Sequence, residues 1–162
     1  MRDAAQGSEL KIVLVEPQIP PNTGNVARLC AALRLPLFLV GALGFEITDR
    51  SLKRAGLDYW PFVDVHLRPD VEAFFASIPV EKMHLFSKRA LTPYTSVTYA
   101  AGDYLVFGSE TKGLPDWLTR RHEDRLRSIP MRTSHVRSLN LSSAVAVATY
   151  EAARQLDLFA SL

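Results

Sequence analysis

Short apolar runs alternate along this chain with segments of helical periodicity, and this alternation restricts the possible folds more than any other feature. Residues 10–15, 37–41, 83–87 and 104–107 are apolar almost throughout, as strands buried on both faces of a parallel sheet are. Because parallel strands need crossover connections, strands that alternate with helices predict an α/β domain, with a largely parallel sheet flanked by helices. The prediction is completed by weaker strands at 63–67 and 126–129, and by helices from about 26, at 48–57, at 71–76, from 115 and from 141.

Length and composition fit one globular domain. The chain has 162 residues, 48% of them apolar, which is enough to bury a substantial core. A net charge of +2 excludes a histone-like binder but leaves room for a local phosphate-binding patch. The single cysteine, Cys30, cannot form an internal disulfide, and no apolar run is long enough to cross a bilayer. We therefore expect a soluble cytoplasmic protein with a single domain over 1–162, in which residues 1–9 form a flexible extension.

The polar loop after the first strand ends in residues that favour the start of a helix. Its prolines preset the backbone, and Asn22 is able to cap the helix. Asn25 and Arg28 are three residues apart, so they point from the same side of that helix. An arginine one turn into such a helix is placed to reach a cleft at the C-terminal edge of the sheet, although a solvated arginine fits the pattern equally well.

A second polar loop lies between the strand at 104–107 and the helix from 115. Gly108 and Gly113 bracket four polar residues, and glycine lets backbone amides approach a ligand closely. Glu110 in this turn is suited to accept a hydrogen bond from a ribose or an amino group, or to orient Arg28. An ordinary tight surface turn is the alternative interpretation.

A third polar loop carries Arg137, Ser138 and Asn140 immediately before the last helix. Asn140 is expected to cap that helix, whose open amides and dipole suit an anionic group. An ordinary capped core helix is the alternative. Beyond its core stripe, the helix presents Tyr150 on a neighbouring face, where a second subunit could pack.

One further stretch is suited to RNA. Lys53 and Arg54 stand near the end of a predicted helix with Tyr59 beyond them, a mixture that fits phosphates and a stacked base, although a solvated helix end is commoner. No glycine-rich dinucleotide or phosphate loop occurs, and the four histidines are scattered without the spacing of metal ligands. We therefore predict no metal.

Taken together, three stretches resemble the three motifs of the SPOUT superfamily of RNA methyltransferases. They are PPNTGNVARLC at 20–30, FGSETKGLP at 107–115, and IPM at 129–131 with RSLNLSSAV at 137–145. The chain is most similar to the compact, TrmL-like branch that methylates the ribose 2′-hydroxyl of the tRNA wobble nucleotide. The run KRAGLDY at 53–59 also resembles that branch, with Lys53 where the branch usually has arginine.

The resemblance implies a deep C-terminal trefoil knot, an exception to the rule that chains do not thread loops. It implies S-adenosyl-L-methionine as methyl donor and a homodimer that pairs the first and last helices. The implied substrate is cytidine or modified uridine at position 34 in the anticodon stem-loop of tRNA, with leucine isoacceptors expected. The residues implied to bind the cofactor are Phe86, Ser87, Gly108, Gly113, Ile129, Met131, Ser138 and Leu139.

By the same resemblance, the catalytic set comprises Arg28, Asn25, Glu110, Ser138 and Asn140, and the RNA-binding set comprises Lys53, Arg54, Arg137 and Tyr150. A guanidinium is very hard to deprotonate, so we expect Arg28 to orient the ribose and stabilise its developing negative charge. Two alternatives stay open. In the first, the enzyme methylates another tRNA position or ribosomal RNA. In the second, the chain is a non-catalytic RNA-binding scaffold.

Overall fold

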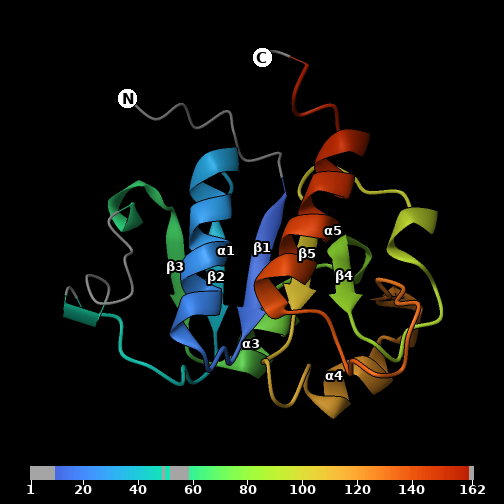
Figure 1. Cartoon of the computed structure of the whole chain (residues 1–162), viewed down its shortest axis with the longest axis horizontal. Coiled ribbons are helices and arrows are strands. Elements are labelled where there is room, and N and C mark those ends of the chain that lie inside the picture. Colours follow the sequence, from blue (N-terminus) through green and yellow to red (C-terminus); the bar gives the residue numbers. More distant parts are fainter. Residues whose placement is uncertain (1–9, 49, 52–58, 161–162) are drawn as a thin grey trace.

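The computed structural model describes residues 10–48, 50–51 and 59–160, and in this part of the chain six strands form a single sheet (Figure 1). Every pairing between neighbouring strands is parallel, which confirms the predicted sheet. The order across the sheet is β3 (Val65–Arg68), β2 (Leu37–Val40), β1 (Lys11–Val15), β5 (Tyr104–Phe107), β4 (Met83–Phe86) and β6 (Leu126–Arg127).

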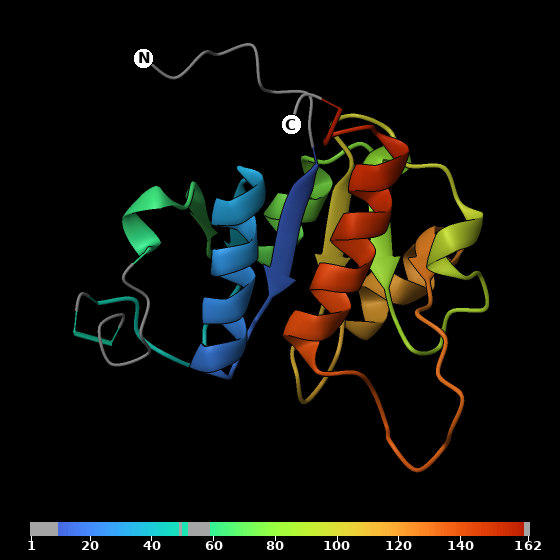
Figure 2. The same cartoon turned by 45° about the horizontal axis from the view of Figure 1, so that its top comes forward.

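Helices cover both faces of this sheet. The two long helices, α1 (Pro20–Leu33) and α5 (Leu141–Gln155), lie side by side on one face (Figures 1 and 2). The shorter α3 (Val71–Ala76) and α4 (Asp116–Arg121) lie on the other. The part of the chain that the structure describes also contains four 3₁₀ turns: η2 (Trp60–Phe62), η3 (Val80–Lys82), η4 (Tyr94–Ser96) and η5 (Glu123–Arg125).

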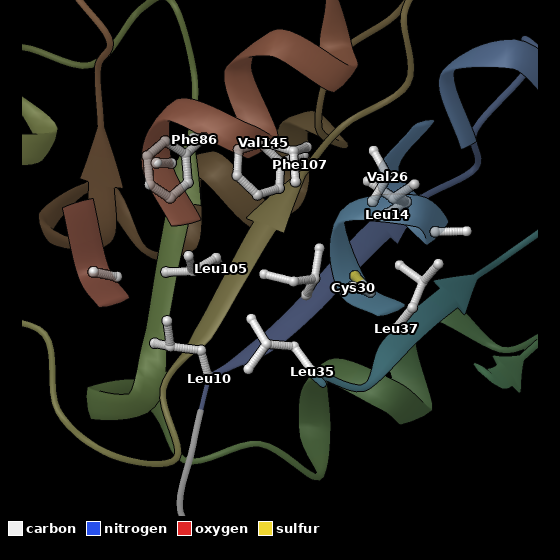
Figure 3. Close-up of a cluster of buried hydrophobic side chains, with 14 of the residues drawn as sticks. Leu10, Leu14, Val26, Cys30, Leu35, Leu37, Phe86, Leu105, Phe107 and Val145 are labelled. Atoms are coloured by element: carbon white, nitrogen blue, oxygen red, sulfur yellow. The ribbon is translucent and has the colours of Figure 1, made fainter. Parts of the chain in front are cut away.

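Alternation along β1 divides the core between the two faces of the sheet. Ile12 and Leu14 pack toward α1 and α5, where Val26 and Val145 join the same cluster (Figure 3). Val13 and Val15 point the other way, into the cluster that includes residues of α3 and α4. Successive side chains of a strand point to opposite faces, so a strand covered by helices on both sides has to be apolar throughout.

Some element ends differ from the sequence prediction. Helix α1 begins at Pro20 rather than after Asn22, because proline tolerates the first turn of a helix, where a backbone N–H has no partner within the helix. The N-cap is Ile19, which contributes no side-chain hydrogen bond, so Asn22 is not the cap. Strand β3 starts two residues later than predicted and β6 ends two residues earlier. The predicted helix at 48–57 falls mostly outside the described residues, as do 1–9.

The loop between β4 and β5 forms hydrogen bonds with two later segments, one just after β6 and one at the C-terminal end of α5. Ser128, just after β6, donates its backbone N–H to the carbonyl of Thr92 at 2.8 Å and accepts from the N–H of Tyr94 at 2.8 Å. At the C-terminal end of α5, the Gln155 side chain accepts from the N–H of Tyr99 and donates to the carbonyl of Val97.

The trefoil knot stays a prediction of the resemblance. No helix of the described residues is long and apolar enough to cross a membrane.

Candidate active site

The three predicted polar loops are joined by one chain of hydrogen bonds at the C-terminal edge of the sheet. Glu110, after β5, accepts from the backbone N–H groups of Gln18 at 2.8 Å and Ile19 at 3.1 Å, both after β1. The Asn22 side-chain amide donates to the same carboxylate at 3.4 Å. The Asn22 carbonyl oxygen in turn accepts from the amide of Asn140 at 3.0 Å. The loops that precede α1, α4 and α5 are therefore tied into one structure.

Asn140 caps α5 as predicted from the sequence. Its Oδ1 accepts from the backbone N–H of Ser142 at 3.0 Å and of Ser143 at 3.3 Å, which are open donors of the first helical turn. The hydroxyl of Ser142 donates to the same oxygen at 2.6 Å. Since Nδ2 is bonded to Asn22, both ends of the Asn140 amide are engaged inside the protein.

The glycine turn after β5 is closed by its own backbone. Ser109 and Gly113 exchange backbone hydrogen bonds of 3.2 and 3.0 Å. A Cβ on Gly108 would lie 2.0 Å from the carbonyl carbon of Gly113, so only glycine lets the two arms of the turn meet here. Gly113 has φ of +69°, in the left-handed region that favours glycine. The need for Gly108 comes from this internal contact.

A mainly apolar pocket lies where β4 and β6 end and the loop to α5 begins. Six of the eight predicted cofactor residues line it: Phe86, Ser87, Ile129, Met131, Ser138 and Leu139. Its remaining lining residues are Lys88, Arg127 and Ala144. Phe86 stacks on Phe107 with ring centroids 4.6 Å apart, which fixes one wall. A mostly apolar pocket with two hydroxyls, those of Ser87 and Ser138, suits a purine base.

A polar pocket adjoins this apolar one and shares Ser87, Lys88 and Ser138 with it. Gly113 and Glu110 lie in its lining, beside the hydroxyls of Ser109, Thr111 and Thr119. An apolar pocket beside a hydroxyl-rich one suits the two halves of S-adenosylmethionine, which are adenosine and a charged amino-acid part. The residues present therefore fit that molecule.

A buried charged network stands beneath the apolar pocket. Arg127 is 5% exposed, and its Nε donates to Nδ1 of His84 at 3.1 Å. His84 Nε2 lies 2.8 Å from Oδ2 of Asp103, so the imidazole is neutral, with its proton on Nε2. Burial lowers the pKa of His84. Burial also opposes ionisation of Asp103, but hydrogen bonds from His84 and from the Ala100 N–H outweigh this effect and keep the pKa of Asp103 below its usual range. The network joins β4, β6 and the loop before β5.

Comparison with known proteins decides the family. The sequence pattern of the SpoU rRNA methylase family matches residues 9–150, most of the chain. The chain belongs to the SpoU rRNA methylase family. It is 46% identical over 155 residues to the tRNA (cytidine(34)-2′-O)-methyltransferase of Aeromonas hydrophila, covering 94% of this chain and 98% of the relative. The enzyme of the same name from Yersinia pestis is 44% identical over 154 residues, covering 91% and 94%.

Solved structures of related proteins agree with this assignment. One that concerns 2-OH methylation of C/U34 on tRNA has a TM-score of 0.84 and 46% identity, over 93% of this chain and 98% of that one. An AdoMet-bound rRNA methyltransferase from Sinorhizobium meliloti has a TM-score of 0.76 and 25% identity, over 91% of this chain and 57% of that one. The resemblance inferred from the three motifs is thus confirmed at the level of the family.

Several predicted site residues of this SpoU-family chain are not in the lining of either pocket. Asn25 and Arg28 are exposed on α1, and neither is in the lining of these two pockets. Gly108 is likewise absent from both linings, as is Arg137, which is exposed in the loop before α5. Tyr150 is 49% exposed on α5 and stacks on Phe159 at 5.6 Å. Lys53 and Arg54 lie outside the described residues.

Other residues of the site were missed from the sequence. Asn22 was interpreted as a cap but links two loops, and Arg127 was only one residue of a predicted strand. Lys88 and Lys112 line the polar pocket; Lys88 belongs to none of the three motifs, and Lys112 stands in the motif at 107–115 but was assigned no role. The available signal was position: each cation comes within a few residues of the C-terminal end of a buried strand, where ligands bind in open α/β sheets.

Proposed function

We propose that this chain transfers a methyl group to the 2′-hydroxyl of the ribose at position 34 of tRNA, a cytidine or a modified uridine. The observation that carries the proposal is the 46% identity to a tRNA (cytidine(34)-2′-O)-methyltransferase, which extends over 94% of this chain and 98% of the relative. Fold likeness alone would support many activities, but likeness at this identity over the whole length includes the site loops.

S-adenosyl-L-methionine is the proposed methyl donor, and when bound it supplies a methyl group activated on a sulfonium. We assign its adenine to the apolar pocket, between Phe86, Ile129, Met131 and Leu139. Its polar half is assigned to the adjoining pocket, beside Ser87, Ser138 and Gly113. Gly108 contributes indirectly, by permitting the turn that carries Gly113.

Arg28 is the proposed catalytic residue for the ribose. A guanidinium keeps its proton at any physiological pH, so we give Arg28 no role as a base. Its fork of N–H donors instead orients the ribose and the adjacent phosphate and stabilises negative charge on the 2′-oxygen. Asn25, on the same side of α1, helps to place the hydroxyl. The location of Arg28 and Asn25 on one helix suits such a positioning task.

Glu110, Asn140 and Ser138 are assigned roles that follow from their contacts. The Glu110 carboxylate is already bonded to the loop after β1, and the Asn140 amide to α5 and Asn22. We therefore treat these two as positioning residues that hold the loops together, rather than groups that orient Arg28. Ser138 lines both pockets, so its hydroxyl is placed to contact either reactant.

We further propose that the chain acts as a homodimer in the cytoplasm, where tRNA is modified in bacteria. Helices α1 and α5 lie side by side on one face, and α5 exposes Val147 by 40% and Tyr150 by 49% there. Apolar side chains exposed together on one helix favour a partner. The anticodon stem-loop is assigned to Arg137, Tyr150, Lys53 and Arg54, and leucine isoacceptors stay a prediction.

The test is transfer of labelled methyl from S-adenosylmethionine to unmodified tRNA, followed by digestion and identification of the labelled nucleotide. We expect 2′-O-methylated cytidine or uridine from position 34. Label in another nucleotide would preserve the enzyme class and discard the substrate. Binding of S-adenosylmethionine without transfer to tRNA or ribosomal RNA would instead favour the scaffold alternative.

Arg28→Lys examines the role of the guanidinium in the same assay. Lysine keeps the charge but loses the planar fork, so we expect turnover to fall on the order of a hundredfold, as after loss of one oxyanion donor. Because Arg28 lines neither pocket, affinity for S-adenosylmethionine should not change. Arg28→Ala provides the reference for complete loss. Near-normal turnover of Arg28→Lys would contradict the bidentate role.

A further inference from the structure

Cations from two separate loops gather at the polar pocket. Lys88 and Arg89 follow β4, and Lys112 belongs to the turn after β5, yet all three line the same pocket. All three side chains are exposed. Within the described residues, neither the Lys88 nor the Lys112 ammonium has a carboxylate within ion-pair distance, so both charges face solvent at the mouth of the pocket.

The carboxylates of this pocket do little to offset these charges. Glu110 is occupied by the backbone N–H groups of Gln18 and Ile19 and by the amide of Asn22. Asp116 is 3.9 Å from Arg89, and both side chains are largely exposed, so their attraction is weak. The pocket therefore presents the two lysines as unpaired positive charges.

The loop before α5 carries two more cations, each next in sequence to a residue that lines a pocket. Arg132 and Arg137 are exposed in this loop, and Ser138, the next residue, lies in the lining of both pockets. Figure 2 shows the loop, in orange, extending beyond the N-terminal end of α5, on the side where the strands end. We call these five residues the basic rim: Lys88, Arg89, Lys112, Arg132 and Arg137. Against Glu110 and Asp116 they leave a formal excess of three positive charges.

We propose that the basic rim binds the backbone phosphates of the substrate RNA on either side of the target nucleotide. This inference rests on the proposed function, and it names a surface that none of the sequence motifs contains as a set. Exposed ammonium groups act on phosphate as point charges and carry no base preference. Ser109, Thr111 and Thr119 lie among them and add donors of the kind that contact phosphate and sugar oxygens.

The position of the rim explains its use. Three of its members, Lys88, Arg89 and Lys112, line the pocket in which the polar half of the methyl donor is proposed to lie, so a strand held by the rim lies next to the donor. Phosphate contacts fix the register and orientation of the RNA without reading its sequence. Such contacts also make affinity steeply dependent on salt, because each releases condensed counterions.

The experiment compares two double variants that each remove two positive charges. Lys88→Gln with Lys112→Gln alters the rim, whereas Arg34→Asn with Arg121→Gln alters two exposed arginines that are not in the lining of the pocket. Asparagine is chosen at residue 34 because φ is +55° there and asparagine tolerates the left-handed region. Binding of a fluorescent anticodon stem-loop is measured by anisotropy between 50 and 300 mM salt, about the range over which phosphate contacts are resolved.

We expect the rim variant to raise Kd on the order of tenfold at 100 mM salt, and to reduce the slope of log K against log salt by about 1.4 to 1.8. The control variant should keep the wild-type slope. Equal slopes for the rim variant and the wild type would overturn the proposal. So would a wild-type protein that shows no salt-dependent binding of the stem-loop.

The rim lysines could also bind the carboxylate of S-adenosylmethionine, which is an anion like phosphate. Calorimetry with S-adenosylmethionine distinguishes these two roles. Weaker cofactor binding by the rim variant with unchanged RNA binding would assign the lysines to the cofactor and overturn the proposal. Methyl transfer is measured separately. If the wild type binds the stem-loop with the expected salt slope but methylates no RNA, the proposed function fails while the rim survives.

Discussion

Asn140→Ala tests the polar connection between the three loops. The substitution removes the acceptor for two backbone N–H groups of α5 and the donor to Asn22. Loss of an N-cap asparagine costs about 1 kcal/mol. Asn22 is 8% exposed, so leaving its carbonyl oxygen without the Asn140 donor costs about another 1 kcal/mol. The expected total is about 2 kcal/mol, or a fall in Tm of about 4 to 8 °C for a domain of this size.

Asn140→Asp is the matched control, because aspartate caps helices as well as asparagine does but has no donor for Asn22. It should lose about 1 kcal/mol, half the effect of alanine. The Asn22→Ala and Asn140→Ala double-mutant cycle then measures the coupling between the two amides directly. Urea unfolding at constant pH and salt supplies these free energies, provided that the m-values agree.

The refuting results are specific. If Asn140→Asp is as destabilising as Asn140→Ala, the cap contributes nothing and the Asn22 contact carries the whole effect. If neither variant changes stability by more than about 0.3 kcal/mol, water replaces these hydrogen bonds without cost and the connection between the loops is not energetically significant. Zero coupling in the cycle would contradict the Asn22–Asn140 bond itself.

Two further predictions use buried titratable groups. Burial lowers the pKa of His84 below its ordinary 6.5, so as pH falls below 6.5 the unfolded chain takes up a proton that the folded chain does not. Stability should then fall with pH by up to about 1.4 kcal/mol per unit, and His84→Gln should remove that slope in urea titrations. Burial also raises the pKa of Cys30 to about 12, so a disulfide reagent at pH 8 should label the thiol only after unfolding. A slope kept by His84→Gln, or rapid labelling of the folded protein, would contradict these placements.

The strands and helices could be predicted from the sequence where the pattern was dense. Residues 71–76 and 104–107 were predicted to the residue as helix and strand. Boundaries failed where local chemistry competes: Asn22 is a good capping residue, but the two prolines before it start the helix earlier. The strand predicted at 126–129 ends at Arg127, because Ser128 pairs with the loop at 92–94 instead.

The contacts inside the site could not be predicted in the same way. The bond between Asn22 and Asn140 joins residues 118 apart, and Glu110 reaches Gln18 across 92 residues. Sequence periodicity shows that such residues lie near strand ends, but the partner of a polar side chain depends on how neighbouring loops pack. Lys88 and Lys112 line one pocket because β4 and β5, the strands that precede them, are neighbours in the sheet.

This difference affects how the catalytic set should be interpreted. Glu110 and Asn140 belong to the motifs that carry the family resemblance, and loss of activity on substituting either would ordinarily be taken as evidence of chemistry. Their contacts predict the same loss without any contact to ribose, because each holds two loops in place. Stability and cofactor affinity therefore have to be measured beside turnover. A fall in turnover with both of these unchanged is the result that would place either side chain against the substrate, and Arg28, exposed and outside both pockets, is the residue for which we expect that result.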